Sequence, residues 1–210
     1  MRKSLVHHAL FLLLLFMMIS ILPAQEKIEI SLMGGHLWGG KYDVSSGRMK
    51  INSGPSFGVT VDIPVKERPG LMAEITYLHI NSGLNYQEQS FAPLTELFDM
   101  KIHYFQAGGL YQEDKGAFTP FGAASIGVAY FVPQDDQFVN EWIFAARLGF
   151  GVKYNVSDHW GLRAQGQLLA PVQLKTGSVW CQSGSGCLIT MQSGTVLLQG
   201  NIMAGLVYRF

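Results

Sequence analysis

The chain has 210 residues, of which 15 are basic and 15 acidic, so its formal net charge is zero. This balance provides no basic surface of the kind that binds nucleic acid. Charged residues make up 14% of the chain, well below the roughly one quarter that is usual for soluble domains. The length suits one domain, or one domain with a targeting segment.

The N-terminus has the three parts of a secretory signal peptide. Arg2 and Lys3 form a basic start, residues 9–22 form an apolar run, and Pro23-Ala24 precedes Gln25 as a cleavage site. The run is closer to the roughly 7 to 15 residues of a signal-peptide core than to the roughly 20 of a spanning helix. An uncleaved anchor helix is the alternative.

We therefore predict a signal peptide over residues 1–24 and a mature domain over residues 25–210. Removing two of the 15 basic residues leaves 13 against 15 acidic ones, a formal charge of about −2 for the mature domain.

From Gln25 onward the sequence divides into runs of about 10 residues in which apolar and polar residues alternate, as in transmembrane strands. No apolar stretch in this part reaches the roughly 18 residues of a spanning helix. Low charge together with the lack of a spanning helix in this part predicts a membrane barrel, because only helices and closed barrels form hydrogen bonds with every backbone N–H and C=O group in lipid. The eight runs are residues 27–39, 56–65, 71–86, 101–111, 119–132, 141–155, 160–171 and 197–210.

Short and long connections alternate between these runs. The short polar ones are residues 66–70, 112–116 and 155–159, and the longer ones are residues 41–55, 87–100, 133–140 and 172–196. Bacterial outer-membrane barrels have short periplasmic turns and longer extracellular loops, so we predict that both termini are periplasmic. A soluble β-sandwich also has short strands, but it gives no reason for this alternation.

Aromatic residues gather near both predicted ends of the strands, as in the girdles where rings lie between hydrocarbon and water. We place Tyr111, Phe121, Tyr154, Trp160, Tyr208 and Phe210 at the periplasmic ends, and Trp38, Tyr86, Tyr130, Phe131 and Trp142 at the outer ends. Because aromatic residues are common in soluble strands too, the two belts support the barrel without proving it.

The last run alternates most regularly. Its apolar parity holds Leu198, Ile202, Ala204, Leu206, Tyr208 and Phe210, and its other parity holds Gln199, Asn201, Gly205 and Arg209. One face is therefore predicted to meet lipid and the other the lumen. Here the sequence resembles the outer-membrane barrel family, whose chains end in such a strand on a C-terminal Phe that is read by the barrel-assembly machinery. The resemblance implies that Leu206, Tyr208 and Phe210 belong to this insertion signal, and a soluble edge strand is the alternative.

A second resemblance concerns the segments 119–124 and 149–163. Thr119-Pro120-Phe121-Gly122 and the hairpin from Gly149 to Trp160-Gly161-Leu162-Arg163 look like the small OmpA/OmpX-type barrels. The resemblance in architecture extends over the whole mature chain, whereas the matching motifs cover about a third of it. It implies an all-β fold, an eight-stranded antiparallel transmembrane β-barrel with up-and-down meander topology. It also implies a monomer in the cell outer membrane, in contact with outer-membrane lipid and lipopolysaccharide.

An eight-stranded barrel is only wide enough for side chains to fill, so inward polar groups must satisfy one another. Strand parity places three acids and four bases inward, namely Glu29, Asp62, Glu74, Arg147, Lys153, Arg163 and Arg209. We interpret them as a paired network that plugs the lumen and holds strand register, because an unpaired buried charge is costly. The alternative is a gated narrow pore in which the ion pairs rearrange. The glycines predicted to make room in the lumen are Gly122, Gly149, Gly151 and Gly161.

Cys181 and Cys187 are the only cysteines and lie in the longest predicted loop. In an exported chain this predicts one disulfide that pins the tip of the loop. A redox or metal site would need Cys-x-x-Cys spacing or further ligands.

The mature histidines, His36, His79, His103 and His159, show no metal-ligand spacing in the sequence, and we predict no metal, cofactor or catalytic residue. The pair His79 and Ser82 only faintly resembles barrel enzymes that modify lipid A.

We predict a non-enzymatic integral outer-membrane protein whose loops 41–55, 87–100 and 172–196 recognise an extracellular ligand that the sequence does not identify. A narrow pore for ions or small solutes is the second hypothesis, and a lipid A-modifying enzyme is the third. The loop 87–100 contains the apolar residues Phe91, Leu94, Leu97 and Phe98. They form either a binding patch or a segment folded onto the rim of the barrel.

Overall fold

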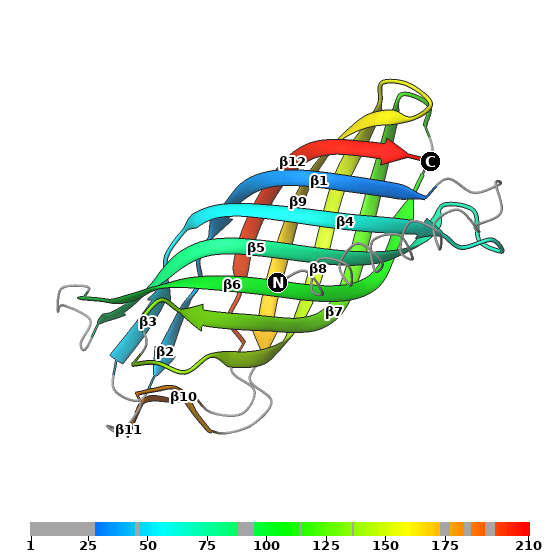
Figure 1. Ribbon diagram of the computed structural model, residues 1–210. Helices are drawn as coiled ribbons and strands as arrows, with labels where there is room; N and C mark the ends of the chain where they lie inside the picture. Colours follow the sequence, from blue (N-terminus) through cyan, green and yellow to red (C-terminus); the bar gives the residue numbers. More distant parts are fainter. Residues whose placement is uncertain are drawn as a thin grey trace, which may run out of the picture.

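The computed structural model describes residues 28–210 except 45–46, 88–94, 114, 136, 173–176, 183–185 and 192–195. The described strands are β1 (Glu29–Trp38), β2 (Lys41–Val44), β3 (Gly47–Ile51), β4 (Gly54–Pro64), β5 (Leu71–Gln87), β6 (Thr95–Gln112), β7 (Phe118–Pro133), β8 (Glu141–Asn155), β9 (Trp160–Val172), β10 (Gly177–Gln182), β11 (Gly186–Met191) and β12 (Gln199–Arg209). Figure 1 shows the long strands curving around a common axis. Among the described residues there is no helix with the length and hydropathy to cross a bilayer.

Eight of these strands close into an antiparallel barrel. Their order around the ring is β1-β4-β5-β6-β7-β8-β9-β12, and β12 pairs with β1. At this closure Glu29 stands opposite Arg209 and Trp38 opposite Gly200. A closed ring has no sheet edge left to pair with another chain. The predicted eight-stranded up-and-down barrel is confirmed.

Each predicted run overlaps one barrel strand, and β8 has the predicted bounds. β6 begins at Thr95, six positions before the predicted start at Lys101, and so takes in much of the predicted loop 87–100. The loops 41–55 and 172–196 contain two hairpins, β2–β3 and β10–β11. These strands have only four to six residues, which is too short for an alternating pattern to stand out.

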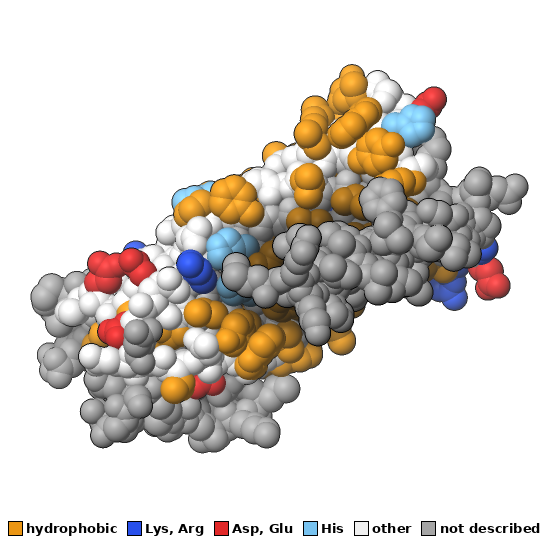
Figure 2. All heavy atoms as spheres, viewed as in Figure 1, with side chains coloured by type: hydrophobic (Ala, Val, Ile, Leu, Met, Phe, Trp, Pro, Cys, Tyr) orange, Lys and Arg blue, Asp and Glu red, His pale blue; other side chains and the backbone are white. Residues whose placement is uncertain are grey.

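Strand alternation separates an apolar exterior from a filled interior. Leu148, Phe150 and Ile126 are more than half exposed, whereas Tyr104 and Arg163 are fully buried. Figure 2 shows hydrophobic side chains over much of the visible outer surface. This is the inverse of a soluble protein, and it fits a barrel surrounded by hydrocarbon.

Three predicted girdle residues and one glycine were assigned to the wrong face, and one of the three is Tyr86, which packs against the apolar cluster inside the barrel. Phe121 and Phe131 are buried at 6% and 0% exposure, while Tyr111 and Trp142 stand outside at 60%. Proximity to a strand end sets the height of a side chain, whereas parity sets its face. Gly122 follows the inward Phe121, so it faces outward rather than into the lumen.

The start of β1, Phe210 and the short turns lie at one end of the barrel, here called the turn end, and the long connections lie at the other, the loop end (Figure 1). From the turn end upward the inward side chains are charged, then polar and uncharged, then apolar. The apolar layer at the loop end includes Leu37, Leu78, Ile80, Ile102, Phe131, Ile143, Leu169 and Leu197.

Two residues of the predicted loop patch join this apolar layer. Phe98 is 5% exposed, and Leu97 packs against the buried cluster. They therefore fold into the rim of the barrel, while Phe91 and Leu94 lie outside the described residues.

Candidate functional site in the barrel lumen

The structure brings the seven predicted inward charges together in one cluster. They come from six strands, β1, β4, β5, β8, β9 and β12, and their side chains are at most 10% exposed. The ion pairs run in sequence from Arg147 to Glu74, Arg163, Asp62, Lys153, Glu29 and Arg209. Bases and acids alternate along this chain, so each acid lies between two bases and no like charges are direct partners.

Arg163 is the centre of the cluster. Its Nη1 donates to Oδ2 of Asp62 at 2.9 Å, its Nη2 to Oε2 of Glu74 at 2.7 Å, and its Nε to Oε1 of Gln165 at 2.8 Å. The carbon of the guanidinium lies 4.5 Å from the ring centroid of Phe121, within the range of a cation–π contact. A planar cation with five donors in fixed directions suits this bridging position better than a lysine would.

Arg147 extends the cluster toward the middle of the lumen. Besides its ion pair with Glu74, its Nε donates to Oγ of Ser125 at 2.9 Å and its Nη1 to Oε1 of Gln167 at 3.1 Å. The charged layer is thereby connected to the uncharged polar layer above it.

Lys153 extends the cluster in the other direction. Its ammonium pairs with Glu29, donates to Oδ2 of Asp62 at 3.1 Å, and donates to Oε1 of Gln112 at 2.9 Å. Gln112 belongs to β6 and Ser125 to β7, so every barrel strand contributes a side chain to this network.

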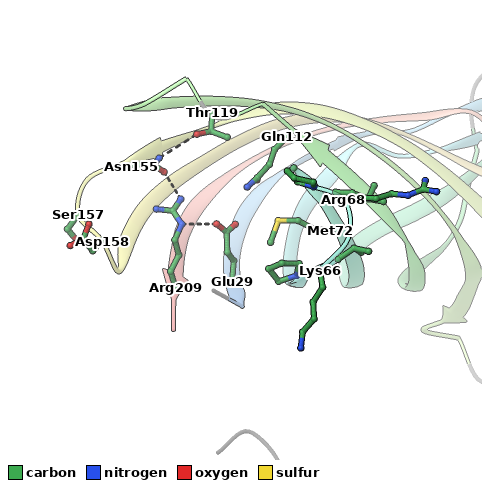
Figure 3. Close-up of a pocket in the computed structure, with 15 residues that line it drawn as sticks. Glu29, Lys66, Arg68, Met72, Gln112, Thr119, Asn155, Ser157, Asp158 and Arg209 are labelled. Carbon is green, nitrogen blue, oxygen red and sulfur yellow. Dashed lines mark hydrogen bonds and ion pairs between the residues drawn. The ribbon is translucent and has the colours of Figure 1, made fainter. Parts of the chain in front are cut away.

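The turn-end mouth is a cavity of about 600 Å³ beneath the cluster. Figure 3 shows Glu29 and Arg209 facing one another on its wall, where Nε of Arg209 donates to Oε1 of Glu29 at 2.7 Å. Arg209 also bonds Asn155, whose amide lies 3.5 Å from Oγ1 of Thr119. The cluster therefore ends at an open mouth, where solvent reaches its last ion pair.

Several buried polar atoms in the charged layer and in the uncharged polar layer above it have no partner among the described residues. They are Oδ1 of Asp62, both amide atoms of Gln106, Nε2 of Gln199 and Nδ2 of Asn201. Leaving such a group unsatisfied costs about 1–3 kcal/mol, and buried water normally bonds groups of this kind. The middle layer is thus the part of the lumen that can hold water or a small polar solute.

Two inward glycines give the cluster its space. A Cβ on Gly151 would lie 2.6 Å from Cζ of Phe121, and one on Gly161 would lie 3.4 Å from Nη2 of Arg209. Gly149 also faces inward, toward Gln167. The sequence prediction is therefore right for these three glycines.

Phe121, Gln112, Ser125, Gln165 and Gln167 were not predicted as parts of the cluster. All five have inward parity, as the charged residues do. The predicted cluster included only charged side chains, and Phe121 was placed by its height alone, without strand parity. Applying it to every polar and aromatic residue would have found them.

The three residues of the predicted insertion signal lie on the outer face of β12 or just after it. Leu206 and Phe210 are 53% and 52% exposed. The ring of Tyr208 lies 4.9 Å from that of Trp160 and 5.0 Å from that of Phe210, by their centroids. This aromatic group marks the turn end beside the seam between the first and last strands.

The remaining predicted residues do not join the cluster. Cys181 and Cys187 stand opposite one another in the register of β10 and β11, but their side chains lie outside the described residues, so the disulfide stays a prediction. His79 and Ser82 lie on opposite faces of β5, and Oγ of Ser82 donates to the carbonyl of Asn52 at 2.6 Å. They form no His–Ser pair.

Comparisons with known proteins give the same architecture. The family described as "outer membrane protein beta-barrel domain" matches residues 10–210. Among solved structures the chain is similar to the Neisserial surface protein A, with a TM-score of 0.58 and 15% identity over 87% of this chain and 97% of that one. It is also similar to OprG from Pseudomonas aeruginosa, with a TM-score of 0.58 and 12% identity over 88% and 96% of the two chains.

A third similar structure is the outer membrane protease OmpT from Escherichia coli, with a TM-score of 0.50 and 9% identity over 90% of this chain and 99% of that one. No curated protein sequence matches the chain. At these identities the likeness shows the fold alone, because one barrel architecture serves unrelated functions.

Proposed function

The chain belongs to the outer membrane protein β-barrel domain family, and from this premise we propose that it is a non-enzymatic platform that presents its loop end to the outside of the cell. Short turns of bacterial outer-membrane barrels face the periplasm, so both termini are periplasmic in this proposal. The recognition surface comprises the connections 41–55 and 172–196 and the rim of residues 87–100.

The filled lumen is the observation that carries the proposal. At the turn end, Arg163 is held between Asp62 and Glu74 and is 1% exposed. At the loop end, Leu78 and Phe131 belong to a continuous apolar layer and are fully buried. A barrel that is plugged at both levels is a rigid scaffold, and rigid scaffolds commonly carry recognition in their loops.

The hairpins in two of the long connections support the same proposal. β3 continues the wall of the barrel by pairing Ile51 with Leu84 and Arg48 with Gln87 of β5. β10 and β11 form a separate two-stranded sheet. Backbone pairing gives these connections a defined shape, which lowers the entropy lost when a partner binds.

Loop replacement in whole cells tests the platform. Residues 173–195 or residues 41–50 are replaced by short Gly/Ser linkers, and cells displaying each variant are applied to an array of immobilised glycans and matrix proteins. We expect the binding profile to change while small-solute uptake stays the same. Heat-modifiable migration on a gel shows that each variant is folded. Unchanged binding by both folded loop variants would refute the proposal.

A narrow pore is the second candidate, and it is favoured by the amide nitrogens of Gln106, Gln199 and Asn201, which have no partner among the described residues. They form a polar level directly above the ion pairs, where a permeating ion or solute would find hydrogen-bond partners. The test is planar-bilayer recording with the pure protein and with Arg147→Ala. Single-channel events whose conductance rises in this variant would support a pore, and no resolvable events in either protein would exclude it.

A further inference from the structure

The outer wall of β5 and β6 carries a group of polar side chains within an otherwise apolar surface. Among the outward-facing residues of the eight barrel strands as described, Lys101 is the only lysine or arginine. Asn81 stands opposite Lys101 in the strand register, and His79 stands opposite His103. Figure 2 shows blue and pale-blue side chains gathered among orange ones on the wall of the barrel. We call Lys101, Asn81, His79 and His103 the wall site.

The two histidines and Asn81 contact one another, and among the described residues the ammonium of Lys101 has no acidic partner. Nδ1 of His79 lies 3.5 Å from Nδ1 of His103, and its Nε2 lies 3.2 Å from Oδ1 of Asn81. The hydroxyl of Tyr77 lies 2.8 Å from Nδ1 of His103. In the described part of the chain no ion pair joins Lys101 to an acid. The wall site therefore has an excess of positive charge.

The height of the wall site matches the boundary between hydrocarbon and headgroups. A strand tilted by about 40° rises about 2.5 Å per residue along the barrel axis. Tyr111 stands in the girdle at the turn end of β6, and Lys101 is ten residues away from it on the same face. The height difference is about 25 Å, which equals the usual apolar band of about 25 Å. His79 and His103 lie about one strand repeat below this boundary.

A hollow of about 430 Å³ begins at the wall site and extends toward the loop end. Besides Asn81 and Lys101, its lining includes Asn52, Ser53, Asp99 and Gln134, which offer both donors and acceptors. Below the wall site the surface is aromatic, with the rings of Tyr77 and Phe105 5.2 Å apart. A cation therefore separates a polar hollow from an apolar wall.

We propose that the wall site binds the phosphorylated sugar headgroup of an outer-leaflet glycolipid. Lys101 binds the phosphate, Asn52 and Asp99 accept hydrogen bonds from sugar hydroxyls in the hollow, and the acyl chains lie along Tyr77 and Phe105. At the hydrocarbon boundary water solvates the lysine ammonium incompletely, so an ion pair with an anion stabilises it. The carboxylate of Asp99 would repel a phosphate in the part of the hollow nearer the loop end. We therefore place the phosphate at the other end of the hollow, beside Lys101 and the histidines. This inference deepens the proposed function and rests on it for the loop end facing the outer leaflet.

The test is native mass spectrometry of the folded barrel in a neutral detergent. The probes are diphosphorylated lipid A, the same lipid after enzymatic dephosphorylation, and phosphatidylglycerol. We expect the wild-type protein to prefer diphosphorylated lipid A over both others. Because a hydrogen bond to a charged group contributes about 1.5–3 kcal/mol, Lys101→Gln should weaken this binding by about tenfold or more.

Matched variants separate the wall site from general effects of charge and folding. Lys66→Gln removes an exposed lysine at the turn end and should leave the preference unchanged. His79→Gln with His103→Gln should weaken binding of diphosphorylated lipid A without changing binding of phosphatidylglycerol. Each variant is first shown to be folded by heat-modifiable migration.

Three outcomes would overturn the inference. They are equal binding of the dephosphorylated lipid, equal binding of phosphatidylglycerol, and binding that a chelator abolishes but Lys101→Gln does not change, which would assign the histidine pair to a metal ion. The measurement uses the purified barrel and a lipid probe, so a negative result leaves the loop-replacement test of the platform intact. Conversely, a failed loop test leaves any measured lipid preference standing.

Discussion

Nη2 of Arg163 lies 2.7 Å from Oε2 of Glu74. The two side chains extend from opposite walls of the barrel and meet in its lumen. Arg163 belongs to β9 and Glu74 to β5, which are four strands apart in either direction around the ring of eight. The pair of Lys153 on β8 with Asp62 on β4 crosses the ring in the same way. Such diametric pairs brace the lumen in addition to the hydrogen bonds between neighbouring strands.

Removal of the central guanidinium should therefore destabilise the barrel strongly. Arg163→Met leaves Asp62 and Glu74 each with one cation fewer, and removing one partner of a buried pair typically costs about 3–5 kcal/mol. The measurement is urea-induced unfolding in detergent, followed by tryptophan fluorescence. As a control, Lys115→Ala removes one side of an ion pair with Glu113 that is about 60% exposed on both sides, and it should cost at most about 1 kcal/mol.

A double-mutant cycle distinguishes pairing from packing at the same cluster. Glu74→Gln and Arg147→Met should each be costly alone, since each leaves a buried partner charge. The double variant should cost less than the sum, because residues in direct contact couple by about 0.5–3 kcal/mol. Additive costs would show that the two side chains act only by filling space.

The barrel was predictable from the sequence because its two defining signals, period-2 alternation and alternating short and long connections, are local. The inward charges followed from the same parity, as Glu74 and Arg147 illustrate. The sequence could not predict which acid pairs with which base. Glu74 and Arg147 lie on β5 and β8, which are three strands apart, and which side chains meet across a lumen depends on how the whole ring closes. The wall site was missed for a related reason. His79 and His103 are far apart in sequence and meet only through the pairing of β5 with β6.

Two glycines provide a matched test of which face is closely packed. A Cβ on Gly151 would lie 2.3 Å from the carbonyl oxygen of Ala164 and 2.6 Å from Cζ of Phe121, whereas one on Gly122 meets nothing within 4 Å. We expect Gly151→Ala to destabilise the barrel by about 1–3 kcal/mol through overpacking. Gly122→Ala should be neutral or slightly stabilising. Equal effects of the two changes in urea unfolding would contradict the assigned faces.

The register of β10 and β11 gives a specific expectation for the two cysteines. Cys181 and Cys187 are direct cross-strand partners, at a separation in the range that a disulfide needs. Protein extracted from the outer membrane without reductant should therefore react with a maleimide only after reduction, with a mass increase of two labels. Two labels before reduction would rule out the disulfide. Cys181→Ser should then leave one reactive thiol while the barrel stays heat-modifiable.

The end of β12 should matter for insertion more than for the stability of the finished barrel. Phe210 and Tyr208 lie on the outer wall, where Tyr208 packs on both Phe210 and Trp160, so Phe210→Ser removes apolar area without opening a cavity in the lumen. We expect several-fold less protein in the outer-membrane fraction, while the protein that does insert unfolds at nearly the same urea concentration. Leu198→Ser, on the same face of the barrel beside the loop end of β12 and 61% exposed, is the matched control and should insert almost normally. If both variants reduced insertion equally, loss of apolar surface in general would explain the result, and Phe210 would have no special part in recognition by the assembly machinery.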